Sequence, residues 1–307
     1  KDIYRLEKIS NEKYAAVEPA SAGLKGGKTI ALIFASGTII SGEEQTLALG
    51  SDTFTRWLRA AVNDNSIRAI IVRVDSPGGS AVGSDIIYHE LTEARKQKPV
   101  IISMSGLAGS GGYWLALGGQ EIIAQPQTLT GSIGVIAGKF SFSQLLEKLG
   151  IKVEKINIGR EADAFSLYKE FTPEEKEILR QELNSTYREF LERVAAARNL
   201  TVEEVNRLGR GRVWTGQQAL ELHLIDRVGG YDQAIEAAKK MAGISPEEKV
   251  RLAVWPKKRS WLDIILGRGK ETAAVNETAE FWQSLKTCLT YGSQPRVWSL
   301  MPDWLLP

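Results

Sequence analysis

The chain has 307 residues, of which 43% are hydrophobic, so it can bury the core of one large domain or two modest ones. Its 39 basic and 37 acidic side chains are interspersed and give a net charge of +2, which argues against nucleic acid or another polyanion as partner. The single cysteine, Cys288, excludes an internal disulfide, and with only His89 and His223 a structural zinc ion would lack ligands. We therefore predict a globular protein without an internal disulfide or a structural zinc site.

The first part of the chain alternates between strand and helix patterns. Residues 1–28 are a polar lead-in that begins at Lys1 rather than Met and ends in a glycine-rich run, so we expect a linker in a fragment or processed product. The apolar runs Ile30–Phe34 and Ala69–Val74 predict strands, and the pattern over Thr53–Val62 predicts a helix between them.

The stretch Val100–Gln120 carries no charged side chain and is long enough to span a membrane. Its six glycines and three serines are atypical of a span, in which large apolar side chains dominate. We predict instead a strand over Val100–Met104, a tight turn and a helix, preceded by a crossover helix that ends near Ala94. Such alternation is typical of an α/β fold with parallel strands and crossover helices.

Further elements follow this run. Apolar patterns predict short strands over Ile122–Ala124 and Ile151–Ile158 and a helix over Phe142–Leu149. The run Thr172-Pro173-Glu174-Glu175 predicts the start of a long helix, with threonine as N-cap, proline in the first helical position and acids in the first turn. Shorter helices extend to Gly243, and we assign residues 29–245 to one domain.

The tail, residues 246–307, differs in composition because it holds five of the eight tryptophans. The cluster Lys257-Lys258-Arg259 precedes the apolar run Trp261–Leu266, a pattern that suits a helix at a membrane interface. An arm that packs on a neighbouring domain or subunit explains the same pattern, and we favour the arm.

Two glycine-rich turns follow predicted strands. Asp75-Ser76-Pro77-Gly78-Gly79-Ser80 comes directly after the second strand, where glycines let backbone N–H groups approach a ligand, although a tight turn with a helix cap explains it equally well. Gly109-Ser110-Gly111-Gly112 comes after the third strand. A serine at such a strand-to-helix turn presents its hydroxyl beside a free N–H group, as an acyl-transfer nucleophile requires; close helix packing is the simpler alternative.

Together these runs resemble the signal peptide peptidase A (protease IV) family, which shares a crotonase-like fold with the Clp peptidase. The resemblance covers about residues 29–243 and includes three more motifs in the family's order. These are Gln125–Val135, Val213–Ala219 and Leu224–Gly230. The resemblance implies a spiral of parallel strands with crossover helices, followed here by a C-terminal tail.

Carried over residue by residue, the resemblance implies that Ser110 is the nucleophile and that Ser132 orients the general base. The N–H groups of Gly111 and of the Gly78–Gly79 turn would form the oxyanion hole. The Clp peptidase uses a histidine as base, but no histidine lies near Ser132, and we expect His89 and His223 to be structural or solvated.

A Ser–Lys dyad is the mechanism that the resemblance implies, and it needs a lysine whose pKa burial has lowered. Compact family members carry this lysine in the loop before the long helix, where this chain has Ala162, and we expect the nearby Lys169 to be a surface charge. In long family members, which resemble two repeats in tandem, the first repeat supplies the lysine. This chain is similar to the second repeat, with a lysine-to-alanine variant or an inactive paralogue as the alternative.

We therefore expect a serine endopeptidase that cleaves hydrophobic peptides such as remnant signal peptides and needs no metal and no diffusible cofactor. The resemblance further implies a homo-oligomer at the bacterial cytoplasmic membrane, with the catalytic domain on the periplasmic side. Two alternatives are a non-catalytic scaffolding domain and an acyl-CoA hydratase or isomerase, for which Glu121 and Asp85 are weak candidates as acid or base.

Overall fold

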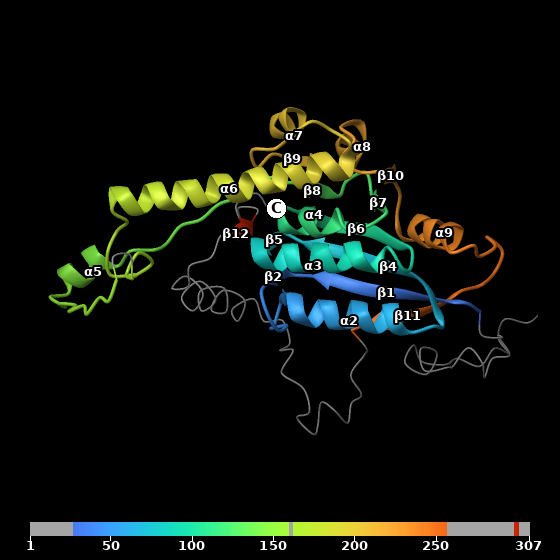
Figure 1. The fold of residues 1–307 in the computed structure, drawn as a ribbon, viewed down its shortest axis with the longest axis horizontal. Helices are drawn as coiled ribbons and strands as arrows, with labels where there is room; N and C mark the ends of the chain where they lie inside the picture. Colours follow the sequence, from blue (N-terminus) through green and yellow to red (C-terminus); the bar gives the residue numbers. More distant parts are fainter. Residues whose placement is uncertain (1–26, 160–161, 257–297, 301–307) are drawn as a thin grey trace, which may run out of the picture.

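A computed structural model describes residues 27–159, 162–256 and 298–300. Parallel strands form its central sheet, in the spatial order β10-β7-β6-β4-β1-β11 (Figure 1). In chain order these strands are β1 (Thr29–Ser36), β4 (Ile67–Ser76), β6 (Val100–Gly109), β7 (Glu121–Ala124), β10 (Arg227–Val228) and β11 (Arg251–Trp255).

Helices cover both faces of this sheet, which is why its strands are almost continuously apolar. On one face, Ala31 and Ile33 of β1 belong to the apolar core beneath α2, α3 and α4. On the other, Ile30 and Leu32 pack in a second cluster with the alanines of α9. The helices are α2 (Ser51–Asn63), α3 (Ala81–Ala94), α4 (Gly111–Ala116), α5 (Ser143–Lys148), α6 (Pro173–Arg198), α7 (Val202–Leu208), α8 (Gly216–Glu221) and α9 (Tyr231–Met241).

Short strands extend the structure at the carboxyl ends of β1, β4 and β6. A second sheet has the order β12-β5-β2-β3, and its members are β2 (Thr38–Ile40), β3 (Ala48–Gly50), β5 (Gly78–Ser80) and β12 (Trp298–Leu300). In the central sheet, β8 (Leu129–Gly131) pairs in parallel with the last residues of β6 and antiparallel with β9 (Val213–Thr215). Both additions surround the turn that joins β6 to α4.

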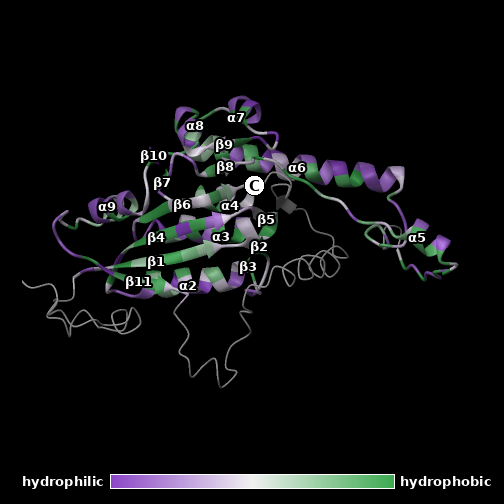
Figure 2. Cartoon of the chain, turned by 180° about the vertical axis from the view of Figure 1, so that it is seen from behind, coloured by the Kyte–Doolittle hydropathy of each residue, from purple (hydrophilic) through white to green (hydrophobic). Residues whose placement is uncertain are grey.

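An arm projects from this body (Figure 1) and consists of α5, residues 149–159 and 162–172 and the first half of α6. Apolar side chains remain exposed along it, among them Ile156 at 95% and Ile158 at 91%. In the body, mostly hydrophobic strands lie between helices that carry many hydrophilic residues (Figure 2). The long helix is anchored to the body through its second half, where Phe190 and Val194 are fully buried.

The structure confirms the predicted α/β fold with a mostly parallel sheet and crossover helices. The uncharged run from Val100 forms β6 and α4, as predicted, and Thr172 caps α6 with Glu175 in a capping box. No helix within the described ranges is long and apolar enough to cross a membrane. The tail contributes β11 to the central sheet, whereas the cluster Lys257–Arg259 and the run Trp261–Leu266 lie outside the described residues.

The predicted strand over Ile151–Ile158 is wrong. The segment lies on the arm and pairs with no strand of the described part of the chain. Alternating apolar residues favour a strand only where a neighbouring strand accepts the backbone hydrogen bonds, and the arm offers none here.

Candidate active site

Ser110 lies at the junction between β6 and α4 in a backbone conformation that residues with a side chain rarely adopt, with φ 52° and ψ −114°. Its N–H donates to the carbonyl of Gly131 at 2.8 Å, and its own carbonyl accepts from the N–H of Trp114 at 2.8 Å. The side chain is fully buried, and its hydroxyl lies 3.5 Å from the carbonyl oxygen of Gly134. Hydrogen bonds on both sides therefore hold the serine in a strained turn.

The glycines that follow Ser110 allow close packing of α4. A Cβ on Gly111 would overlap the hydroxyl of Ser84 on α3. One on Gly112 would come within 2.9 Å of the carbonyl oxygen of Ser76. The small residues of this run thus serve close packing, as the simpler interpretation of the sequence proposed, and the same packing brings the serine turn to the end of β4.

The Gly78–Gly79 turn meets the serine turn. The nitrogen of Gly79 lies 3.2 Å from the position that a Cβ on Gly111 would take, and the Cα of Gly78 lies 3.3 Å from it. Both glycines of the turn have positive φ, 103° and 150°, and a Cβ on Gly79 would overlap the carbonyl of Ile39. The N–H of Gly78 donates to Ser76 Oγ at 3.1 Å. Gly79 in turn pairs with Ile39 of β2 and with Ser299 of β12. The turn as a whole, rather than one of its two N–H groups, is therefore the candidate for contact with a ligand beside Gly111.

Ser132 lies beside Ser110 because of strand register. In the parallel pair of β6 and β8, Gly109 is opposite Gly131, so Ser110 and Ser132 are the next residues along the two strands. Ser132 is 3% exposed, has a positive φ of 48°, and donates its N–H to the carbonyl of Arg212 at 2.7 Å. The five candidates that the sequence analysis placed on three separate motifs thus converge at one end of the sheet.

The loop before α6 holds Ala162, which is exposed, and Lys169, which is not the solvated surface charge that we expected. Lys169 Nζ lies 2.6 Å from carboxylate oxygens of both Asp163 and Glu175, and its side chain is only 23% exposed. The hydrogen bond with Asp163 raises the pKa of Lys169 and holds the pKa of Asp163 well below its usual range. A lysine stabilised in its charged form is a poor proton acceptor.

Lys139 is a structural residue that the sequence analysis missed. Its Nζ donates to the carbonyls of Ala164 and Ser166 at 2.5 and 3.1 Å and lies 4.3 Å from the centre of the Phe171 ring. Burial lowers its pKa. Together with Lys169 it fixes the loop that carries Ala162, and no sequence motif marks either contact because both depend on how the loop folds back.

The packing of α4, which follows the serine turn, against α6 and α3 also has no signal in the sequence. The ring of Trp114 packs 4.6 Å from that of Phe190, which joins α4 to α6. The Arg193 guanidinium lies over the rings of Tyr88 and Trp114 and forms an ion pair of 2.9 Å with Asp85. Asp85 is thus engaged in a contact between helices, which leaves little scope for it as a catalytic acid or base.

The remaining candidates lie on elements other than the serine turn. His89 is exposed on α3, and His223 follows α8 at a left-handed position with φ 58°. Glu121 is opposite Ile101 on β6, so it is eight residues, or roughly 26 Å, from Gly109 along that strand. It forms an ion pair of 3.3 Å with Arg227. Glu121 is therefore too far from the serine turn to act there as an acid or base for acyl-CoA chemistry.

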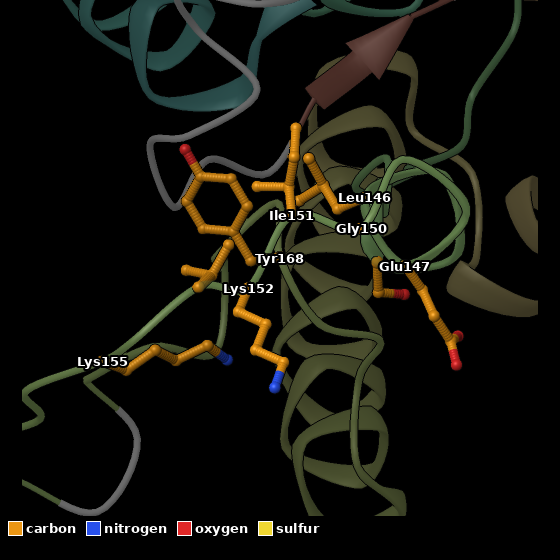
Figure 3. A pocket seen from close by; sticks show the side chains of 9 residues that line it. Leu146, Glu147, Gly150, Ile151, Lys152, Lys155 and Tyr168 are labelled. Carbon is orange, nitrogen blue, oxygen red and sulfur yellow. The ribbon is translucent and has the colours of Figure 1, made fainter.

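Two further observations concern ligands. A cavity of about 290 Å³ lies on the arm rather than at Ser110, between α5 and the extended segment that follows it (Figure 3). Its walls include Leu146, Ile151, Val153 and Tyr168, with Lys152 and Lys155 at one side. No cluster of three potential metal ligands occurs among residues 27–159, 162–256 and 298–300.

Strands that spiral into a parallel sheet, with glycine turns meeting at their carboxyl ends, define a protein of the crotonase and Clp-peptidase fold class. Within that class, the sequence model described as "Peptidase family S49" matches residues 92–245. A chloroplastic serine protease SPPA of Arabidopsis thaliana is 35% identical over 304 residues, and Protease 4 of Salmonella typhi is 38% identical over 235. A putative protease of Synechocystis is 35% identical over 271 residues. The chain belongs to peptidase family S49, a family of serine peptidases.

The relatives differ in length. The match covers 97% of this chain but only 45% of the Arabidopsis protein, and 76% of this chain but 37% of the Salmonella protein. The Synechocystis protein is matched over 95% of its length, with 87% of this chain covered. The chain thus spans less than half of the two longer relatives.

Proposed function

We propose that this chain carries the nucleophile of a serine peptidase and that the nucleophile is Ser110. The meeting of Gly111 with the Gly78–Gly79 turn, directly beside a serine held at positive φ, is the observation that carries this proposal. A serine so placed has donors aimed at the oxygen that becomes negative when its hydroxyl attacks a carbonyl. We assign these donors to the N–H groups of Gly111 and of the Gly78–Gly79 turn, which lies against it.

Peptide hydrolysis would proceed by acylation of Ser110 and then hydrolysis of the acyl-enzyme. The Ser110 oxygen attacks the carbonyl carbon of the scissile peptide, its proton passes to a base, and the tetrahedral intermediate releases the amine, which takes that proton. Water then attacks the acyl-enzyme with the same base accepting its proton, and the acid product leaves as Ser110 is regenerated. We assign the orientation of the base to Ser132, because it follows Gly131, which pairs with Gly109.

We propose that the base is a lysine supplied from outside this chain. Ala162 occupies the loop position at which compact family members carry it, and Lys169 is paired with Asp163 and Glu175. The two longer relatives have room for a preceding repeat that would supply a lysine. A neutral amine near neutral pH requires burial against apolar groups, which a domain or subunit that covers Ser110 would provide.

We further propose hydrophobic peptides in extended form as substrates. A relative of Enterococcus faecium, 33% identical over 188 residues, is named a putative signal peptide peptidase. Homo-oligomer formation, attachment to the bacterial cytoplasmic membrane and a periplasmic orientation belong to the same proposal. Fractionation of cells after expression, with protease protection of the intact cells, tests the last two.

The test of the nucleophile is covalent labelling with a fluorophosphonate probe, followed by mass spectrometric mapping of the labelled residue. It is applied to this chain and to Ala162→Lys, which restores a lysine in the loop before α6. We expect the label on Ser110, faster in Ala162→Lys, and lost in Ala162→Lys combined with Ser110→Ala. Ser141→Ala, which changes an exposed serine, is the matched control. A label on another serine, or none in either protein, contradicts the assignment.

A further inference from the structure

The strand that carries Gly78 and Gly79 has a neighbour from the far end of the chain. On one side, Gly79 of β5 pairs with Ile39 of β2 in parallel. On the other side, β12 pairs with β5 antiparallel, with Leu300 opposite Gly78, Ser299 opposite Gly79 and Trp298 opposite Ser80. Figure 1 shows β12 at the end of the body, beside β5. The tail therefore returns to the catalytic end of the sheet after residues 257–297.

This edge of β5 is where an extended peptide would have to bind. Gly79 contributes to the proposed oxyanion hole, so the scissile carbonyl must lie against β5 and Gly111. An extended peptide that adds a strand to a free sheet edge gains main-chain hydrogen bonds whatever its side chains are. In the sheet order β12-β5-β2-β3, the position next to β5 that a peptide would take is held by β12.

We propose that residues 298–300 occupy the peptide-binding edge of β5 and compete there with extended peptides for the same main-chain groups. That this edge of β5 binds peptides rests on the proposed function. What is new is that the chain's own tail occupies the edge. Because the tail is tethered, its effective concentration at β5 is on the order of millimolar. Three paired residues are a short strand, so a peptide substrate displaces the tail rather than being excluded by it.

The experiment measures peptide binding rather than catalysis. The probe is a fluorescent hexapeptide with the sequence of residues 296–301, Arg-Val-Trp-Ser-Leu-Met, and fluorescence anisotropy reports its binding. All chains carry Ser110→Ala, so that no turnover occurs. The 307-residue chain is compared with one that lacks residues 298–307 and with a matched control that lacks only 301–307 and keeps β12.

We expect the chain without residues 298–307 to bind the hexapeptide at least ten-fold more tightly than the other two. A second pair of variants leaves the chain length unchanged: Ser299→Pro, which removes an N–H from the middle of β12 and disrupts its pairing, should bind as tightly as the shortened chain. Ser299→Ala, which keeps the main chain intact, should bind as weakly as the unchanged protein.

Three outcomes would each overturn the inference. They are equal affinities for the hexapeptide in all chains, an equal gain in affinity on removing only 301–307, and no binding to the chain without 298–307. Failure of the fluorophosphonate label to reach Ser110 overturns the proposed function instead. The two results are independent, because the anisotropy measurement needs neither the hydroxyl of Ser110 nor a base.

Discussion

Replacing Gly111 by alanine tests the proposed oxyanion hole through geometry, without changing any charge. The new methyl group would meet the hydroxyl of Ser84, which now donates to the carbonyl of Ser80 at 2.9 Å. That hydroxyl can rotate away at the loss of one hydrogen bond, which contributes about 1 kcal/mol to stability. The protein should therefore remain folded and lose only about 1–2 kcal/mol of its free energy of unfolding in urea.

The effect on chemistry should be larger. The same methyl group would lie 3.2 Å from the nitrogen of Gly79 and 3.3 Å from the Cα of Gly78, so this backbone must move by a few tenths of an ångström. The methyl group also lies between Gly111 and the Gly78–Gly79 turn, where we propose that the oxyanion binds. Loss of one oxyanion-hole donor lowers the rate by about 10²–10³-fold. Labelling of Ser110 in Gly111→Ala should slow by that factor in the Ala162→Lys background.

A double variant separates packing from chemistry. Ser84→Ala removes the hydroxyl that the new methyl group meets, so Gly111→Ala should cost less stability in the Ser84→Ala background than in the unchanged protein. Its labelling rate should stay low, because the contact with Gly79 persists. If Gly111→Ala labels at the unchanged rate, or if Ser84→Ala restores the rate, the N–H groups of this turn are not the oxyanion donors.

Three further predictions concern the serine turn and the loop before α6. Ser110→Gly should raise the free energy of unfolding by about 1 kcal/mol, because glycine adopts φ 52° without strain; a loss of stability in urea would show that the turn is not strained. Ala162→Lys should allow this chain to hydrolyse a hydrophobic peptide by itself whereas Ala162→Arg should not, since arginine keeps its proton; equal activities would remove the lysine from the mechanism. Asp163→Asn should destabilise the protein near neutral pH and make no difference in acid, because Lys169 lowers the pKa of Asp163 in the folded state. The ion pair therefore stabilises the fold fully above the unfolded pKa of about 4, and this stabilisation is lost as the pH falls from there through the lower folded pKa. A stability difference between the two proteins that stays constant from neutral pH into acid would contradict this account.

Local sequence patterns identified most of the sheet and its helices correctly. Ile30–Phe34, Ala69–Val74 and Val100–Met104 are strands because each is an apolar run bounded by turn residues, and both faces of the sheet are buried. Ile151–Ile158 has a comparable pattern but lies on the arm without a strand beside it. Pairing depends on a partner that is distant in sequence, so periodicity alone could not distinguish these cases.

The candidate site shows the same division. The sequence determined which residue types stand at the turns: a serine between glycines after β6, two glycines after β4 and a serine after β8. Only the tertiary structure decided which of them meet, because the parallel register sets Gly109 opposite Gly131 and the absence of side chains lets Gly111 touch the Gly78–Gly79 turn. It also decided that Lys169 is held as a cation between two carboxylates and that β12 lies on β5. Such contacts join residues far apart in the chain, and their energies depend on distance and burial, which residue order alone does not specify.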